Sequence, residues 1–228
     1  MAMAAHWGMT TARTGFRMVR DEIAARLRLV QILSPAFPIG AFAHSQGLET
    51  AIADGRVTDA GDLQDWIAAV LTQGSARSDA IFLSMARRPG ADLAALADLF
   101  EAWLPSAERA IETAELGRAF QSLTQTKAPA LPYPLAVGAA TQDMDLPEDE
   151  VLALFLQGVA AQLVSVAVRF LPLGQTEGQR VLAALAPVIA ATAQTAAGAG
   201  EADLWAFTPG ADLAAMAHET LETRIFRT

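Results

Sequence analysis

The residue types that could do chemistry gather in one short stretch, residues 34–49. His44 and Ser45 are neighbours there, and Glu49 follows four positions after Ser45. Serine, histidine and a carboxylate make a catalytic triad only when they converge in space beside an oxyanion hole. Adjacent residues on a helix point about a third of a turn apart, and no G-x-S-x-G elbow is present. We therefore expect Ser45 to be a small helix residue or a backbone cap, and we expect no catalytic residue here.

Metal-ligand patterns are also missing. The three histidines, His6, His44 and His218, lie in different segments, cysteine is absent, and no H-E-x-x-H spacing occurs. His218 and Glu219 are adjacent, and neighbours one apart do not share a helix face. We expect a polar helix end at this pair and no metal site in the chain.

A glycine-bearing segment, residues 174–180, is the one candidate for phosphate binding. It lacks the G-x-x-x-x-G-K-[ST] pattern, and the only lysine of the chain, Lys127, lies elsewhere. The spacing predicts a helix entry in which Thr176 is the N-cap and Gln179 completes a capping box. Gln175 and Gln179 add more uncharged amide than a cap needs, which would suit a protein interface.

The last residues of the chain combine guanidinium and apolar groups, at Arg224, Phe226 and Arg227. Arginine and aromatic residues are enriched at the energetic centres of protein interfaces. A chain end also frays in many domains. The residues alone leave both readings open.

The 34–49 stretch must join two helices. Pro35 and Pro38 lack a backbone donor and push the preceding residue towards extended geometry. The sequence therefore predicts one helix over about 21–33 and a second over about 41–53. We expect Pro35, Pro38, Gly40 and Gly47 to be structural residues of this corner.

The apolar residues of the corner pose a choice, because burying each is worth roughly 1.5–3 kcal/mol. Phe37, Ile39 and Phe42 either fill the core of the protein or are covered by a partner. We expect Phe37 and Ile39 to form a mostly internal elbow. Phe42 is expected on the second helix, whose outward face would serve an assembly. The first helix is expected to bury one face, made of Ile23, Leu27, Val30 and Leu33.

Alanine and leucine recur at helical spacing along the rest of the chain, and alternating β-branched runs are missing. We predict an all-α fold, a single compact bundle of about ten helices around a buried central helix at about 148–171. A helix over about 176–197 should be kinked by Pro187. No long linker divides the chain, so we expect a flexible leader over residues 1–18 and one domain over residues 19–228.

The composition excludes several function classes. A net charge of −9 without a basic run argues against nucleic-acid binding. The apolar run at 151–173 is interrupted by Gln157, Gln162, Ser165 and Arg169, so a buried helix is favoured over a membrane span. The start of the chain has no clean secretory signal, and we expect a cytoplasmic protein. With 53% hydrophobic and 18% charged residues, it should bury more surface than one copy provides.

Four segments in order resemble the family of the urease accessory protein UreF. The first is residues 34–40 with Phe42, Ser45, Gly47, Leu48 and Glu49. The others are Tyr133-Pro134 with Gly138, residues 163–179, and His218-Glu219-Thr220 with residues 224–227. The similarity spans about residues 27–228. Two positions depart from the family pattern: Ala41 stands where glycine is common, and His44 where tyrosine is common.

The resemblance implies a non-enzymatic maturation factor. Proteins of this family are all-α and dimeric, bind UreD (also called UreH) and the GTPase UreG, and help to deliver nickel to apo-urease. The assembled complex, rather than this chain, would handle the nickel, so no cofactor is expected. The tail would be ordered by UreD. The expected partner-binding residues are Phe42, His44, Ser45, Glu49, Gln175, Thr176, Gln179, His218, Glu219, Arg224, Phe226 and Arg227.

Two other functions remain open at this point. In the first, the protein regulates GTP hydrolysis by UreG directly, through an arginine supplied in trans. Arg180 and Arg224 are the candidates for that arginine. In the second, the chain is a free-standing helical hydrolase that uses Ser45 and Glu49.

Overall fold

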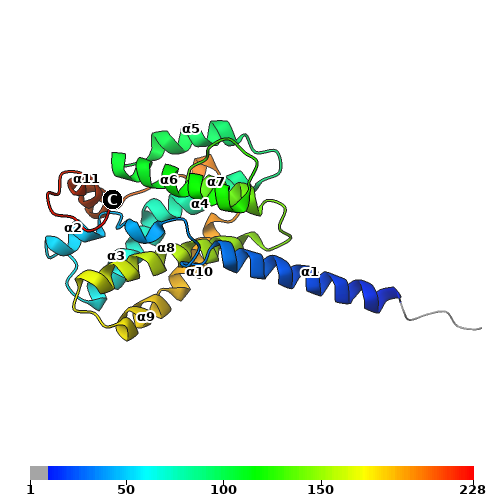
Figure 1. Cartoon of the computed structure of the whole chain (residues 1–228), viewed down its shortest axis with the longest axis horizontal. Coiled ribbons are helices and arrows are strands. Elements are labelled where there is room, and N and C mark those ends of the chain that lie inside the picture. The colour runs from blue at the N-terminus through cyan, green and yellow to red at the C-terminus, as the bar shows by residue number, and fades with distance from the viewer. Residues whose placement is uncertain (1–9) are drawn as a thin grey trace, which may run out of the picture.

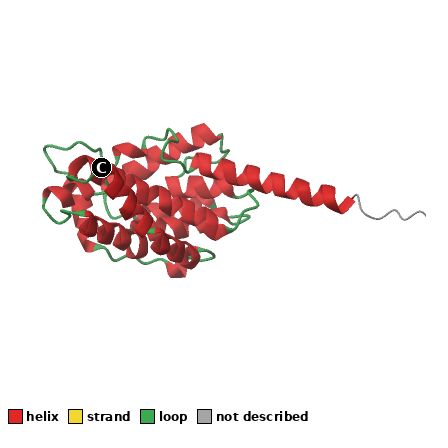
Figure 2. Ribbon diagram, turned by 90° about the horizontal axis from the view of Figure 1, so that it is seen from below, coloured by secondary structure: helices red, strands yellow, loops and turns green. Residues whose placement is uncertain are grey.

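Helices and their connections account for all of residues 10–228, which the computed structural model describes, with side chains from residue 20 onward. No strand occurs in that range, so the all-α prediction is confirmed (Figure 2). The helices in chain order are α1 (Thr10–Ile32), the short 3-10 helix η1 (Ala41–Ala43), α2 (Leu48–Ala53), α3 (Ala60–Gln73), α4 (Ser75–Arg87), α5 (Leu93–Trp103), α6 (Ala107–Thr124), α7 (Tyr133–Thr141), α8 (Glu148–Phe170), α9 (Gln175–Ala184), α10 (Ala186–Ala196), η2 (Glu201–Asp203) and α11 (Pro209–His218).

The central helix is α8, as the sequence predicts. It contacts α2, α3, α4, α9 and α10, and its buried residues point in several directions around its axis. By length and composition α8 could cross a membrane, but half of its most apolar window is buried inside the fold. The apolar side chains of α8 therefore pack against its neighbouring helices.

Local sequence signals set several helix starts. The side chains of Asp59, Asp92 and Ser106 accept hydrogen bonds from the first backbone amides of α3, α5 and α6. These bonds satisfy amides that have no partner within the helix. All three are residue types that are favoured at helix N-caps.

The first helix differs from its prediction in length and in orientation. It begins at Thr10 rather than near residue 21, so residues 10–18 of the expected leader are helical, while residues 1–9 lie outside the described residues. Its N-terminal part extends away from the other helices (Figure 1). The expected buried face was wrong for Ile23, Leu27 and Val30, which are exposed.

The core side of α1 carries other residues. Leu29 and Ile32 are buried, together with Leu33 just after the helix. Two apolar stripes therefore run along the same helix. Periodicity alone cannot say which of two apolar stripes meets the core, because both have helical spacing.

The predicted long helix over 176–197 is two helices. The break falls at Leu185, and Pro187 lies in the first turn of α10, where its missing N–H costs nothing. The predicted capping box at α9 was also wrong: Gly174 is the N-cap, no side chain caps the helix, and Thr176 lies within its first turn.

The second predicted helix, over 41–53, was wrong as well. Residues 44–47 separate η1 from α2, with His44 in extended geometry. Gln46 and Gly47 have φ values of 54° and 79°, in the left-handed region. This bend lets α11 approach, because a Cβ at residue 47 would lie 2.5 Å from the backbone nitrogen of Ala215.

Gly40 and Gly47 form a matched pair for a stability test. Both have left-handed φ values, but a Cβ at residue 40 would have no atom within 4 Å. Gly40→Ala should cost ~1–2 kcal/mol, the backbone penalty alone. Gly47→Ala should cost clearly more, since the α11 backbone must also move. Urea unfolding of both variants measures this, and equal losses would contradict the role given to Gly47.

Candidate functional site: the 41–49 segment and the C-terminal tail

The C-terminal tail meets the segment that joins α1 to α2. The C-terminal tail, defined here as residues 219–228, returns from α11 and lies along residues 43–45 beside α2 (Figure 1). The backbone N–H of Arg227 donates to the carbonyl of Ala43 over 2.7 Å. The backbone N–H and the hydroxyl of Ser45 both donate to the carbonyl of Thr228. The tail is therefore bound to the protein through its main chain, and it does not fray.

Residues of the tail alternate between the core and the surface. Phe226 and Thr228 are buried, whereas Arg224, Ile225 and Arg227 are exposed. The ring of Phe226 packs against Phe170 at the end of α8, with centroids 5.6 Å apart. This alternation places apolar and guanidinium groups on the outside while one aromatic ring anchors the tail.

Glu49 holds the tail at its centre. One carboxylate oxygen of Glu49 accepts from the backbone N–H of Ile225 over 2.8 Å. The other accepts from Phe226 N–H over 3.0 Å and contacts Nε2 of His218, also at 3.0 Å. Glu49 is only 2% exposed. A buried carboxylate is costly unless it is paired, and these three donors satisfy it.

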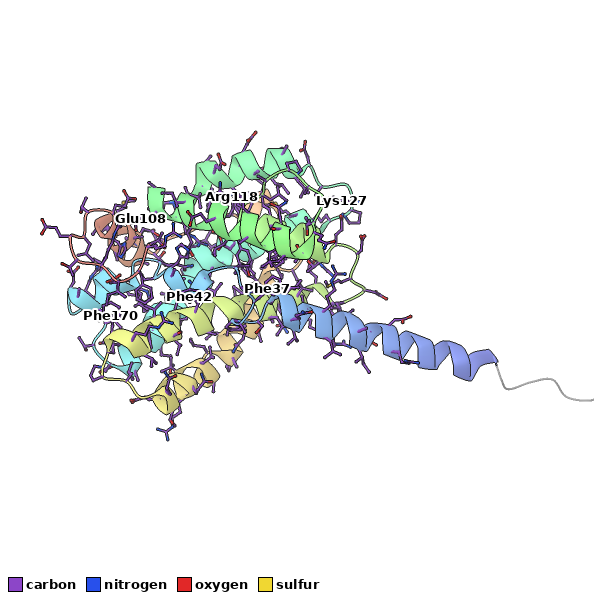
Figure 3. All side chains as sticks on the ribbon, in the orientation of Figure 1. Phe37, Phe42, Glu108, Arg118, Lys127 and Phe170 are labelled. Carbon is purple, nitrogen blue, oxygen red and sulfur yellow. The ribbon has the colours of Figure 1, made fainter. Side chains whose placement is uncertain are left out.

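His218, which is fully buried, links Glu49 to a second carboxylate. Its Nδ1 lies 2.7 Å from Glu108, at the start of α6 (Figure 3). Glu108 also accepts from the guanidinium of Arg224 over 2.6 Å. An ionised carboxylate can only accept, so both contacts of the ring are hydrogen bonds when both ring nitrogens carry hydrogen. The imidazole ring thus lies between the Glu49 and Glu108 carboxylates, and the Arg224 guanidinium is bound to the second of them.

A second buried ionic group lies next to the tail. Arg109 pairs with Asp79 and with Glu112, at 2.9 Å from the latter. Glu112 also accepts from the side-chain amide of Gln46. One guanidinium thus serves two buried carboxylates, and burial raises the pKa of Asp79 to about 6 although Arg109 opposes the shift. Burial also lowers the pKa of His44, which contacts the Thr228 hydroxyl.

An apolar groove borders this region on the other side. Phe42 on η1 is 67% exposed and lies beside α8 (Figure 3). Together with Phe37, Ile39, Phe155 and Val159 it lines a groove of about 240 Å³. Phe37 and Ile39 pack against the core while part of each stays accessible. The corner therefore fills the core and also offers an apolar surface.

The structure corrects where several predicted residues lie. We expected His44, Ser45 and Glu49 on a helix with an exposed face, but all three are buried, because the 44–47 bend turns them towards the tail. His218 and Phe226 are buried too. None of these five offers its side chain to the surface in this conformation, and any effect they have on a partner must pass through their neighbours.

The exposed predicted residues fall into separate groups. Arg224 and Arg227 flank Ile225 on the tail. Glu219 is exposed and accepts from the backbone N–H of Ala107, so it caps α6. A third group, on the first turns of α9, is exposed and outside the tail cluster: Gln175, Thr176 and Gln179. Partner binding remains a prediction for all of them.

Sequence reasoning missed the acceptors on α6 and α4. Glu108, Glu112 and Asp79 each lie on a helix with polar neighbours, so nothing in their spacing marks them as buried. The one available signal is compositional. An acidic protein must place some carboxylates near its few arginines, and Arg109 is flanked by Glu108 and followed by Glu112 three residues later.

The polar groups of the site are occupied by contacts within the chain. The Ser45 hydroxyl donates to a backbone carbonyl, and the Glu49 carboxylate is occupied by the tail and by His218. Among the side chains described, no group of three or more His, Asp and Glu could hold a metal ion. The hydrolase hypothesis gains no support from this geometry.

Asp79 makes the pH dependence of stability testable. Its pKa in the folded protein is above the usual 3.8, so the folded state holds the proton more tightly. The resulting stabilisation is complete below about pH 4 and is lost as pH rises through about 6, amounting to roughly 3 kcal/mol. Asp79→Asn should remove this loss, so the variant gains stability relative to the wild type between pH 4 and 7 in urea unfolding.

Asp62 provides a control of opposite sign. Hydrogen bonds from the Thr58 hydroxyl and backbone lower the pKa of Asp62. Its stabilisation is therefore present above the unfolded pKa and is lost as pH falls, and Asp62→Asn should lose stability relative to the wild type as pH rises through about 4. If the Asp79→Asn and Asp62→Asn profiles had the same sign, the assignment for Asp79 would be wrong.

Comparison with known proteins gives the family. A family model described as UreF matches residues 57–186, more than half of the chain. "Urease accessory protein UreF" of Cereibacter sphaeroides (strain KD131 / KCTC 12085) is 55% identical over 212 residues, which cover 90% of this chain and 99% of the relative. The protein of the same name from Paracoccus denitrificans (strain Pd 1222) is 52% identical over 208 residues, covering 90% and 96%.

A more distant relative agrees. "Urease accessory protein UreF" of Rhodopseudomonas palustris (strain BisA53) is 43% identical over 222 residues, covering 90% of this chain and 93% of the relative. All three relatives are named as accessory proteins and not as enzymes. With identities this high over nearly the whole length, the chain belongs to the UreF family of urease accessory proteins.

Proposed function

We propose that this protein is a urease maturation factor, a dimeric adaptor between UreD (UreH) and the GTPase UreG during nickel delivery to apo-urease in the cytoplasm. The observation that carries the proposal is the composite surface formed by residues 41–43 and the C-terminal tail. There Phe42, Ile225 and two tail arginines are exposed around a buried ionic core. A rigid apolar surface with guanidinium groups is typical of a protein interface.

An adaptor needs more than one binding surface, and the chain has further exposed apolar side chains. Trp205, Phe207, Leu213 and Met216 are all exposed between η2 and the end of α11. Exposed groups of this size in a folded protein commonly mark interaction sites. They are candidates for contact with a second partner.

The alternative, an arginine supplied to UreG, has less support. The guanidinium of Arg224 is already bound to Glu108. Arg180 is exposed on α9. GTP turnover by UreG, measured with the wild type, Arg180→Ala and Arg224→Ala, separates the two functions: a loss of stimulation with retained binding would favour the arginine mechanism.

The adaptor function predicts a specific loss on charging the surface. Phe42→Asp should weaken binding of UreD from the same organism by about tenfold or more, since a hot-spot aromatic is worth roughly 2 kcal/mol or more. Leu123→Asp is the matched control, because Leu123 is another exposed apolar residue, near the C-terminal end of α6. Surface plasmon resonance with immobilised UreD gives both affinities.

The same proposal makes a prediction in the cell. Deleting the gene should leave urease apoprotein without nickel, and the wild-type gene should restore nickel content and activity. If the purified protein bound neither UreD nor UreG and deletion left urease active, the proposal would be abandoned.

We also propose that the protein is a homodimer and that α1 contributes to the interface. Ile23, Leu27 and Val30 form an exposed apolar stripe. It continues into a groove of about 350 Å³ between α1, α8 and α9, lined by Val30, Leu33, Leu154, Gly158 and Leu182. An uncovered stripe joined to a groove fits self-association and the apolar composition of the chain.

Dimerisation can be tested with one substitution. Leu27→Glu should convert a particle of twice the 24.0 kDa chain mass into a monomer in light scattering, without unfolding it, because Leu27 is 66% exposed. Arg28→Glu is the control, since neighbouring residues point about 100° apart on a helix. A wild type that stays monomeric at micromolar concentration would contradict the proposal.

A further inference from the structure

We propose that Glu49 is a positioning residue. Its buried carboxylate holds the tail on the protein, so that residues 41–43 and 224–227 act as one surface for a partner that Glu49 itself never touches. This inference rests on the proposed adaptor function. It concerns how the binding surface is assembled, and not which proteins bind.

Contacts that hold the tail converge on Glu49. It accepts from two successive backbone amides, those of Ile225 and Phe226, and from His218. The other long-range backbone contacts of the tail are with Ala43 and Ser45. The two amides held by Glu49 flank the point where the chain turns Phe226 inwards and Ile225 outwards. Ile225 is 75% exposed, so its outward position is fixed by its backbone alone.

The three donors around residue 49 require a carboxylate there. Two oxygens that only accept are needed to receive two neighbouring N–H groups and a ring N–H. A glutamine at this position would offer one oxygen and one NH₂ group. Its NH₂ would face either a backbone N–H or the ring of His218, and one buried donor would be left without an acceptor. Holding the tail therefore requires the carboxylate of Glu49, and a glutamine of the same shape would not replace it.

Glu49 is also coupled to Arg224. His218 joins Glu49 to Glu108, and Glu108 holds the Arg224 guanidinium. Residues 224, 225 and 226 are thus fixed by one ionic group, through two backbone amides and one side chain. Losing the Glu49 carboxylate should free the two amides directly and loosen Arg224 through His218 and Glu108, because the members of a buried polar network support one another.

Amide hydrogen exchange of the full-length protein tests the positioning role without any partner. In Glu49→Gln, exchange at Ile225 and Phe226 should accelerate by about tenfold or more, relative to buried amides of α8 in the same sample. Glu115→Gln is the matched control. Glu115 binds the Arg227 side chain on the same surface but holds no tail amide. It should leave these two exchange rates near the wild-type values.

Binding of UreD is the second measurement. Glu49→Gln should weaken it by about tenfold although the side chain is buried, whereas Glu115→Gln should have a smaller effect. Unchanged exchange at Ile225 and Phe226 in Glu49→Gln would overturn the inference, and so would faster exchange with unchanged UreD affinity. Acceleration at α8 as strong as at the tail would also overturn it, because it would show a general loss of stability.

The two proposals fail in different ways. If the wild type did not bind UreD, the adaptor function would fall, and the inference of a partner surface would fall with it. If the wild type bound UreD and Glu49→Gln bound equally well with a freed tail, only the positioning role would fall.

Discussion

The structure depends on the need to pair its buried carboxylates with hydrogen-bond donors. Glu49 and Glu112 are each at most 2% exposed, Glu108 is nearly as buried, and such groups are tolerated only when donors surround them. Several donors come from distant parts of the chain, His218 from α11 and two amides from the tail, whereas Arg109 lies on α6 beside the carboxylates that it serves there. Satisfying these charges brings α2, α6 and α11 together with the C-terminal tail.

The bundle around this core makes the convergence possible. α8 supplies a helix that is apolar on many sides, and Phe170 at its end receives the ring of Phe226. Gly47 removes the atom that would keep α11 from α2, so His218 can reach Glu49. Apolar packing thus sets the distances between the helices, and the ionic contacts determine which polar side chains pair.

Much of the helical framework could be predicted from the sequence, because it depends on local signals. Asp59, Asp92 and Ser106 each lie within four residues of the amides that they cap. The apolar residues on all sides of α8 mark it as the central helix of the bundle. The predictions from the sequence were wrong where residues distant along the chain determine the local structure. The 44–47 bend depends on α11 and on the tail, and the exposure of Leu27 depends on which stripe of α1 meets the core.

The sequence predicted which segments form the candidate site, but it did not predict the contacts between them. The family resemblance brought the 34–49 stretch and the tail together, yet it placed His44, Ser45 and Glu49 on an exposed face. Their burial follows from hydrogen bonds to residues more than 160 positions away, such as Ile225 and Thr228. No local pattern encodes a partner at that separation.

The separation between Glu49 and the tail also bears on how the chain is made. Glu49 and Phe226 are 177 residues apart, so Glu49 leaves the ribosome long before its partners exist. Until then its carboxylate has to remain in water, and residues 41–49 have no reason to adopt their final bend. The composite surface therefore exists only on a chain whose last helix has folded, and incomplete chains do not display it.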